Sequence, residues 1–512
     1  MLNSQIPIYP EPYWRDPNPF PEFPNLKEDL KTDVVVVGAG IAGITTAYLL
    51  AKEGKNIILV DAGRVGNGTT GHTTAKITAQ HDVIYDELIQ HFGTAEAESY
   101  YLANMSAKKF IENTIHQLAI DCDFKQEDAY LYTIDDANKA KLETEAKAYQ
   151  TLGIKGSYMD KLPLELGEKA GLVMPSQARF HPLRYLQKLL DEFVSLGGKV
   201  FENTTVVDIE EGHHPTVITR ENLKITCQDV VLCTHFPCYD KGAFFARLHA
   251  DRSYVLAIKP EKVYPGGMYL SIDSPATRSL REVTINGEQH VLVGGQSHKT
   301  GKGVCTMQHY EVLEQFARDT FGIKAYLYRW SAQDLITLDK VPYIGRMTEK
   351  HRNIYIATGF RKWGMSHSTI SALLITDLIM ERPNPYEKLY TPSRFQADPS
   401  LRNAVVQNLD VAGTLLAGKV GLTFKEPKDL AKDEGAVVMV DGQRCGGYRD
   451  SDGDLHIVDS TCTHMGCEVE WNHGDRTWDC PCHGSRFSTD GEVIEGPAER
   501  PLGKVALEVE QR

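Results

Sequence analysis

The sequence predicts an α/β domain with a parallel sheet, followed by a small all-β domain. Strands expected at 32–37 and 56–61 flank a helix at 41–53, and such a βαβ unit is typical of a parallel sheet. Near the C-terminus, short strands alternate with tight turns such as Asp441-Gly442 and Asp490-Gly491, which favour antiparallel hairpins. The two patterns indicate separate folding units.

Between these units, the apolar periodicity predicts several further elements. Helices are expected at 94–117, 135–151 and 182–196, the last ending at Gly197-Gly198. Strand-like runs follow at 199–209, 216–219 and 230–234, and a strand at 353–358 leads through a glycine-rich turn into a helix at 365–380.

The segments fall into four parts along the chain. A proline-rich and aromatic N-terminal arm (1–30) precedes the α/β domain (31–390), a proline-rich linker (391–415) follows, and the all-β domain occupies 416–512. A chain of 512 residues is long enough for this division, because one domain usually has roughly 100–200 residues.

Charge and hydropathy exclude some classes of partner. With 55 Lys and Arg against 69 Asp and Glu, the net charge of −14 disfavours nucleic acid or an anionic membrane surface. The N-terminus has no basic segment followed by an apolar run, and no stretch approaches the roughly 18 apolar residues that span a bilayer. We therefore expect a cytoplasmic protein without a membrane span.

Cysteines and histidines gather near the C-terminus. Cys462-x-His464 is followed, after fifteen residues, by Cys480-x-x-His483. Two thiolates and two imidazoles can hold a structural zinc ion, or they can hold a [2Fe–2S] cluster in which histidines replace two thiolates on one iron. From the ligand types alone, the two alternatives are about equal.

A second, offset cysteine pair favours the cluster. Cys467 and Cys482 each lie beside one ligand pair, and the Gly496-Pro497 turn follows. This arrangement resembles the Rieske proteins of respiratory and photosynthetic cytochrome complexes. The resemblance implies a [2Fe–2S] cluster with Cys462 and Cys480 on one iron and His464 and His483 on the other, and a disulfide between Cys467 and Cys482.

Two further positions bear on the cluster. By the same resemblance, Ser485 donates a hydrogen bond to a bridging sulfide. Where respiratory members have a Tyr that donates to a ligand sulfur, this chain has Phe487, which lacks a hydroxyl. Because fewer hydrogen bonds to the cluster sulfurs lower the reduction potential, we predict a potential below that of the respiratory proteins.

The first βαβ unit carries a nucleotide-binding pattern. Gly38-x-Gly40-x-x-Gly43 follows the first strand and opens the helix, where backbone N–H groups and the helix dipole attract a pyrophosphate. Asp61 ends the next strand, at the position where a carboxylate accepts hydrogen bonds from a ribose. A bound dinucleotide is expected.

A second small-residue loop at 64–72 indicates which dinucleotide. The loop, together with the segments 230–234, 339–345 and 353–364, resembles the flavoproteins of the D-amino-acid-oxidase type. The resemblance implies a Rossmann-type FAD-binding domain interleaved with an α+β substrate domain. The implied FAD contacts are Gly38, Ala39, Gly40, Ile41, Ala42, Gly43, Asp61, Ala62, Arg64, Gly68, Thr69, Thr70, Gly71, Val207, Thr234, Gly359 and Gly364.

The substrate side carries a departure from the amino-acid oxidases. Those relatives place an Arg shortly after a Trp to hold a substrate carboxylate, whereas this chain has Asp334 after Trp330. The stretch looks closer to gamma-glutamylputrescine oxidoreductase, so Asp334 could pair with a substrate ammonium, although an Asp on an exposed loop is usually only solvated. Other weak catalytic candidates are His72, Arg361 and Trp363, with Lys362 and His367 beside them.

The sequence therefore predicts an FAD-dependent dehydrogenase. A small amine, amino acid or hydroxy acid would reduce FAD by hydride transfer, and electrons would pass through the Rieske cluster to an unidentified acceptor. The chain has no second G-x-G-x-x-G after a strand, which argues against an NAD(P)H domain. The alternatives are a non-catalytic redox sensor or adaptor, and a Rieske oxygenase, for which only Asp208, His213 and His214 offer an unconvincing iron site.

Overall fold

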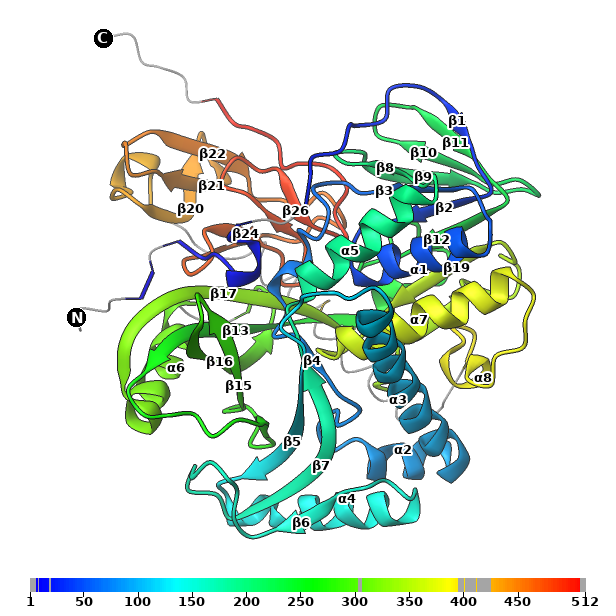
Figure 1. Cartoon of the computed structure of the whole chain (residues 1–512). Coiled ribbons are helices and arrows are strands. Elements are labelled where there is room, and N and C mark those ends of the chain that lie inside the picture. Colours follow the sequence, from blue (N-terminus) through cyan, green and yellow to red (C-terminus); the bar gives the residue numbers. More distant parts are fainter. Residues whose placement is uncertain are drawn as a thin grey trace.

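The computed structural model places the nucleotide-binding pattern, a large curved sheet and the C-terminal domain in contact with one another (Figure 1). It describes residues 6–506 apart from 8, 18–19, 303–305, 395–399, 401–410 and 412–424. Most of the predicted linker lies outside the described residues. None of the helices in the described ranges is both long enough and apolar enough to cross a bilayer.

A six-stranded sheet forms the centre of the first domain. Its strands are, in order, β18 (Tyr343–Arg346), β19 (Ile354–Thr358), β12 (Asp229–Leu232), β2 (Val34–Val37), β3 (Ile57–Val60) and β8 (Lys199–Phe201). All neighbours are parallel except β18 and β19. Leu232, Val37 and Val60 are register partners, so the chain leaves β12, β2 and β3 at one edge of the sheet.

Helices cover this sheet with apolar residues. α1 (Ile41–Lys52) packs between α5 (Pro182–Ser195) and α7 (Gly364–Ile379) in Figure 1. α1 and α7 are buried on nearly all sides, as expected of helices enclosed by other elements. The remaining helices are α2 (Tyr85–Phe92), α3 (Thr94–Gln117), α4 (Lys139–Thr151), α6 (Met307–Phe321) and α8 (Glu387–Tyr390).

A larger, mostly antiparallel sheet lies beside the central one. Its main path runs β17 (Ile323–Thr337), β13 (Leu248–Pro260), β16 (Glu288–Lys299), β15 (Arg278–Ile285), β14 (Met268–Ser271), β5 (Lys125–Thr133), β7 (Ala170–Arg179) and β4 (Lys76–Ile77), with β6 (Ser157–Met159) paired to β7. A small sheet holds β1 (Leu30–Lys31), β11 (Lys224–Thr226), β10 (Thr216–Thr219) and β9 (Val206–Glu210).

The C-terminal domain consists of two antiparallel sheets. One contains β20 (Glu434–Val440), β21 (Gln443–Arg449) and β22 (Leu455–Asp459); the other contains β23 (Glu470–Asn472), β24 (Thr477–Asp479), β25 (Arg486–Phe487) and β26 (Val493–Glu495). Trp478, Phe487 and Val469 are fully buried in its core. The predicted α/β and all-β folds are both present.

Two predicted elements differ in detail. The helix expected at 135–151 begins at Lys139, because Asp135 caps a short 3-10 turn at Asp136–Asn138 instead. The run expected as one strand at 199–209 divides into β8 and β9, which belong to different sheets, and Asn203 between them has a positive φ of 48°. A turn there breaks the strand.

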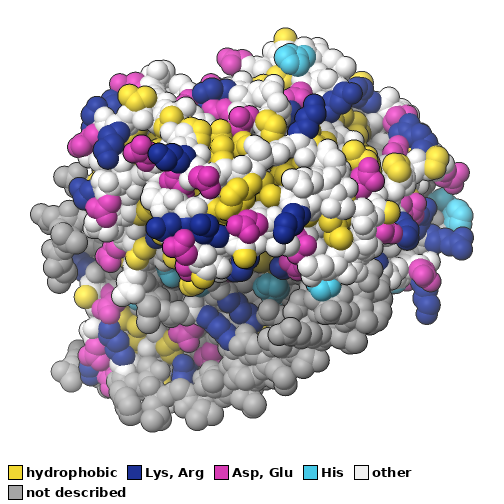
Figure 2. Space-filling model, turned by 90° about the horizontal axis from the view of Figure 1, so that it is seen from below, with side chains coloured by type: hydrophobic (Ala, Val, Ile, Leu, Met, Phe, Trp, Pro, Cys, Tyr) yellow, Lys and Arg dark blue, Asp and Glu magenta, His cyan; other side chains and the backbone are white. Residues whose placement is uncertain are grey.

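The N-terminal arm packs along the first domain. Trp14 is 1% exposed and donates from Nε1 to the Thr73 carbonyl at 2.7 Å, while the Glu11 N–H donates to the Arg329 carbonyl on β17. On the face seen from below, acidic and basic side chains are interspersed (Figure 2). The described part of that face therefore shows no broad area of one charge sign.

Candidate functional site

One cavity of about 1130 Å³ begins where the chain leaves β2, β3 and β12. It continues past the loop at 66–74, reaches β13 and β17 of the large sheet, and is bounded on another side by β26 of the C-terminal domain. The volume is above the roughly 300–1,000 Å³ of ordinary ligand pockets. There is room for a dinucleotide and a second molecule.

The glycines of the first loop are required by close backbone approach. Gly38 has a φ of +99°, and a Cβ there would lie 2.5 Å from the Cys233 carbonyl oxygen. A Cβ on Gly43 would lie 1.8 Å from the Gly38 carbonyl oxygen, so α1 can start directly behind the loop. The N-terminus of α1 consequently faces the cavity, which suits a pyrophosphate.

Asp61 connects the two strands that carry the nucleotide pattern. Its Oδ2 accepts a hydrogen bond from the Ala39 N–H at 2.7 Å, and its Oδ1 accepts one from the Gly63 N–H at 2.8 Å. Burial raises the pKa of this carboxyl, although the side chain lines the cavity. Asp61 can therefore accept further hydrogen bonds there, as a ribose would require.

Most of the predicted FAD contacts line the cavity. They are Gly38, Ala39, Gly40, Ile41, Ala42, Asp61, Ala62, Gly68, Thr69, Thr70, Thr234 and Gly364. Thr70 also joins the two loops, because its hydroxyl accepts from the Ile41 N–H at 3.1 Å. A glycine loop, a helix N-terminus and a carboxylate at one end of a long cavity fit an FAD molecule.

Five predicted contacts do not line it. Arg64 pairs instead with Glu22 and Glu202 at 2.8 Å each. The cavity is lined by Val206 rather than Val207, at a point where the pairing of β9 with β10 shifts register. The other three, which pack against backbone or side chains, are Gly43, Gly71 and Gly359.

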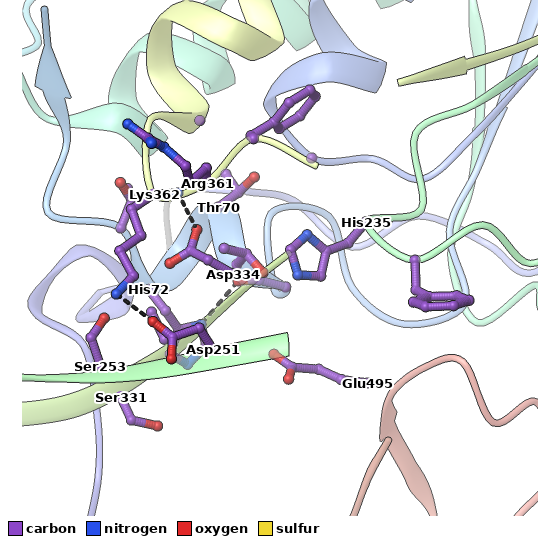
Figure 3. A pocket seen from close by; sticks show the side chains of 18 of the residues that line it. Thr70, His72, His235, Asp251, Ser253, Ser331, Asp334, Arg361, Lys362 and Glu495 are labelled. Atoms are coloured by element: carbon purple, nitrogen blue, oxygen red, sulfur yellow. Dashed lines mark hydrogen bonds and ion pairs between the residues drawn. The ribbon is translucent and has the colours of Figure 1, made fainter. Parts of the chain in front are cut away.

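The large sheet contributes two facing carboxylates. Asp251 on β13 and Asp334 on β17 are direct cross-strand partners. Lys362 lies between them: its Nζ is 2.6 Å from Asp251 Oδ2, and its backbone N–H donates to Asp334 Oδ1 at 3.1 Å (Figure 3). Asp334 is thus part of a strand that lines the cavity, rather than an exposed loop.

The environment of Asp334 favours contact with a cation. Burial raises its pKa from 3.8 to about 6, with nearby Asp251 adding to the rise and Lys362 opposing it. Its Oδ2 receives no hydrogen bond from any described residue. A carboxylate held at one oxygen and free at the other can accept an N–H from a bound molecule.

The other candidate residues have different surroundings. His72 lines the cavity, and its Nδ1 lies 2.9 Å from the Gly68 carbonyl oxygen. The Arg361 guanidinium donates to the His81 carbonyl at 2.5 Å, and Trp363 stacks on the His81 ring with centroids 4.7 Å apart. Both also line the cavity, whereas His367 lies behind it, with burial lowering its pKa to about 3.

The predicted cluster ligands converge in the C-terminal domain. The His464 and His483 rings are perpendicular, with centroids 4.9 Å apart, and the Cys462 and Cys480 thiols contact each other. The Nδ1 atoms of both histidines are buried, and no described residue forms a hydrogen bond with either of them. Two unpartnered imidazole nitrogens beside two thiols fit a metal centre with this ligand set.

The second cysteine pair is bonded. Cys467 Sγ and Cys482 Sγ are 2.03 Å apart, which joins the two ligand loops. The sulfurs of Cys467, Cys480 and Cys482 lie within 4.8 Å of one another, and the disulfide leaves Cys480 as the one thiol of this group that could bind a metal. Within the described residues, no comparable group contains Asp208, His213 or His214.

Aromatic side chains of the first domain contact the two predicted ligand histidines. The Phe236 ring lies edge-on to His464 with centroids 6.3 Å apart, and Phe245 lies edge-on to His483 at 6.2 Å. Gln333 Nε2 donates to the Gly484 carbonyl at 2.9 Å, beside His483. The histidine edge of the C-terminal domain is thus docked on the first domain.

A buried ionic network holds the same interface. Arg252 of β13 is 0% exposed, and its guanidinium lies 3.2 Å from Asp475 Oδ2 and 3.7 Å from Asp479 Oδ2. Glu495 of β26 lies 3.5 Å from Arg486 and reaches the cavity that Asp334 lines (Figure 3). The sequence patterns did not indicate Arg252, Asp251 or Glu495, since only the tertiary fold brings them to this site.

Comparisons with known proteins agree with both halves of the site. The model of the FAD dependent oxidoreductase family (DAO) matches residues 33–378, and the Rieske [2Fe-2S] domain model matches 422–506. The latter match decides between zinc and an iron–sulfur cluster. YhfW of Bacillus subtilis (strain 168), described as a Rieske 2Fe-2S iron-sulfur protein, is 49% identical over 500 residues, 98% of each chain.

More distant relatives cover the first domain. Gamma-glutamylputrescine oxidoreductase of Escherichia coli (strain K12) is 22% identical over 391 residues, which are 72% of this chain and 88% of the relative. The crystal structure of glycine oxidase from Geobacillus kaustophilus superposes with a TM-score of 0.58 at 15% identity, covering 72% of this chain and 99% of that chain. This superposition shows a shared fold.

Proposed function

Because the chain belongs to the FAD-dependent oxidoreductase family of the D-amino-acid-oxidase type and also carries a Rieske domain, we propose that it is an amine dehydrogenase. A small amine would be oxidised at the flavin, and electrons would leave through the Rieske cluster to an external one-electron acceptor. The observation that carries this proposal is the single cavity that joins the nucleotide loops, Asp334 and the C-terminal domain.

The chemistry follows from the two cofactors. Bound FAD would supply the acceptor for a hydride from the carbon beside the nitrogen, and a Rieske cluster held by the C-terminal domain would supply one-electron transfer. The amine loses two electrons and two protons overall and becomes an imine, which water hydrolyses. The two electrons would reach an acceptor of the one-electron class, such as a cytochrome or another iron–sulfur protein.

Asp334 supports an amine rather than a carboxylate at its end of the cavity. Its free Oδ2 can accept an N–H from the substrate, and Asp251 beside it adds negative charge. Lys362 neutralises part of that charge through Asp251 Oδ2. The E. coli relative whose name includes gamma-glutamylputrescine, an amine, is consistent with this substrate class.

The docked histidine edge supports an internal path for the electrons. Phe236 follows β12, the strand that returns to the nucleotide loops, and its ring contacts the ring of His464. His235 lies next to Phe236 in the chain and lines the cavity, and Figure 3 shows it beside Asp334. The path from cavity to cluster therefore runs through neighbouring residues of one loop.

The proposal is tested with the purified holoprotein mixed anaerobically with a panel of amines, amino acids and hydroxy acids. We expect amines to bleach the flavin absorbance, and Asp334→Asn to weaken that response while FAD stays bound. Flavin that no member of the panel reduces would favour a redox sensor or adaptor. Reduction by hydroxy acids alone would contradict the amine assignment.

A further inference from the structure

A buried lysine lines the cavity beside the large sheet. Lys76 of β4 is 9% exposed, and its Nζ donates to the Tyr269 carbonyl at 3.0 Å and to Ser279 Oγ at 2.7 Å. These acceptors belong to β14 and β15 of the large sheet. An ammonium group has three donors, so one remains for a molecule in the cavity.

Lys76 has no carboxylate partner among the described residues. No ion pair involves it, whereas Lys340, which lines the same cavity, is 2.5 Å from Glu87 Oε2. Buried lysines are ordinarily paired, because an isolated charge in a protein interior loses its hydration without compensation. The missing counter-charge indicates that an anion belongs in the cavity beside Lys76.

A second buried cation strengthens this local positive field. Arg281 of β15 donates to the Thr74 and Ala75 carbonyls at 2.8 Å each, immediately before Lys76 in the chain. Burial and the charge of Arg281 lower the pKa of Lys76 to about 7. A bound anion would relieve both effects, because it stabilises the protonated amine.

Hydroxyl groups near Lys76 add further donors. Ser274, Thr277 and Ser279 all line the cavity, and Ser279 contacts the lysine directly. A carboxylate has two oxygens with about four acceptor sites, so it can use the ammonium and a hydroxyl together. This combination of one cation and several hydroxyls suits a carboxylate group.

The position of Lys76 constrains the shape of the substrate. The strand register connects Ser279 to Gly294, Gly294 to Val255, and Val255 to Trp330. The amine of Lys76 thus lies three strands from β17, and Asp334 lies four residues beyond Trp330. In a flat sheet these offsets are roughly 14 Å across the strands and 13 Å along them.

Sheet curvature and side-chain reach shorten this separation, but an α-amino acid, in which one carbon joins the two groups, is too short to contact both residues. We propose that Lys76 binds a carboxylate at the far end of an extended amine substrate, whose nitrogen is held at Asp334. This assignment rests on the amine dehydrogenase function proposed above. It also explains how the chain can bind a carboxylate without the arginine that Asp334 replaces.

The test uses the full-length holoprotein and three probes of equal chain length: 6-aminohexanoate, hexylamine and hexanoate. Binding is measured by calorimetry and by the shift of the flavin absorbance band. A charge-assisted hydrogen bond contributes at least about tenfold to affinity. Lys76→Met should therefore lower the affinity for 6-aminohexanoate and for hexanoate by tenfold or more and leave the affinity for hexylamine unchanged. Lys340→Met, which removes a paired lysine of the same cavity, should change none of them.

Stability separates a binding role from a structural one. Lys76→Met removes a buried charge that has no counter-charge among the described residues, so the melting temperature of the variant should equal or exceed that of the wild type. Lys76→Gln provides a second neutral variant and should lose carboxylate binding equally. Equal probe affinities in wild type and both variants would overturn the assignment, as would a wild type that binds none of the probes or prefers hexylamine.

The same experiment distinguishes this assignment from the proposed function. If the probes bind through Lys76 but no amine reduces the flavin, the dehydrogenase proposal fails and the carboxylate site remains. If amines reduce the flavin and Lys76→Met is indistinguishable from wild type toward 6-aminohexanoate, the carboxylate site fails and the dehydrogenase proposal remains.

Discussion

Phe236 of the flavin domain lies edge-on to His464 of the Rieske domain, with ring centroids 6.3 Å apart. His464 is one of the two predicted ligand histidines, whose Nδ1 atoms have no hydrogen-bond partner among the described residues, so the contact is made on a ring that is expected to hold the metal. The flavin domain thus contacts the histidine edge of the Rieske domain.

Replacing Phe236 should slow electron transfer between the two centres. Phe236→Leu keeps an apolar side chain but removes the ring contact with His464. We expect flavin reduction by substrate to keep its rate, while reduction of the cluster becomes slower in stopped-flow absorbance. Phe92→Leu, at the end of α2, is the control and should leave both phases unchanged. Equal cluster rates in both variants would contradict a path through Phe236.

Arg252 should hold the two domains together. Arg252→Met leaves Asp475 and Asp479 buried with less counter-charge, and breaking a buried ion pair costs about 3–5 kcal/mol. We expect a clear fall in the denaturant midpoint of unfolding. Lys388→Met removes an exposed pair with Glu96 and should cost at most about 1 kcal/mol. Comparable losses in the two variants would show that the Arg252 network contributes little.

Asp334 should control how activity depends on pH. Its pKa is raised from 3.8 to about 6, so the carboxylate is ionised above pH 6 and protonated below it. Oxidation of a cationic amine should therefore lose kcat/KM as the pH falls through about 6. Asp334→Asn should lack this acid limb and lose roughly 10-fold to 150-fold in kcat/KM above pH 7.

The same pKa shift has a consequence for stability. A carboxyl whose pKa is raised on folding stabilises the folded state below its unfolded pKa, and this contribution is lost as the pH rises through about 6. Asp334→Asn should therefore raise the melting temperature relative to wild type more at pH 8 than at pH 4. A constant difference across this range would contradict the shift.

Phe487 should keep the cluster potential low. It is fully buried on β25 opposite Trp478, so a hydroxyl added to its ring would lie inside the C-terminal domain rather than in solvent. If the new hydrogen bond stabilises the reduced cluster by about 1 kcal/mol more than the oxidised cluster, Phe487→Tyr raises the midpoint potential by roughly 40 mV. A redox titration followed by EPR measures the change, and an unchanged or lower potential would refute the role given to Phe487.

Local sequence patterns predicted the parts of the fold that depend on neighbours in the chain. The bounds of α3 at Thr94–Gln117 agree with the expected helix, because its apolar spacing extends over many turns. The loop of Gly38 and Gly43 was also predictable, since those positions have no room for a Cβ.

Contacts between distant segments were not predictable in this way. Arg252 and Gln333 are single polar residues within strands, and nothing near them in the sequence indicates that they meet Asp475 and Gly484. Lys76 likewise follows a loop of small residues, and only its burial without a counter-charge among the described residues distinguishes it from an ordinary surface lysine. Val207 was expected to contact FAD, whereas its neighbour Val206 lines the cavity; the register shift between β9 and β10 at this point could not be read from the sequence.

The central claim is that electrons pass from substrate to flavin and then to the Rieske cluster within one chain. The most direct test is anaerobic mixing of the holoprotein with a single equivalent of an amine that it oxidises, followed by absorbance and freeze-quench EPR. We predict that flavin bleaching comes first and that the EPR signal of the reduced cluster appears as the flavin absorbance recovers, at a rate independent of protein concentration. A cluster that is reduced before the flavin, or only at a rate proportional to protein concentration, would contradict the account.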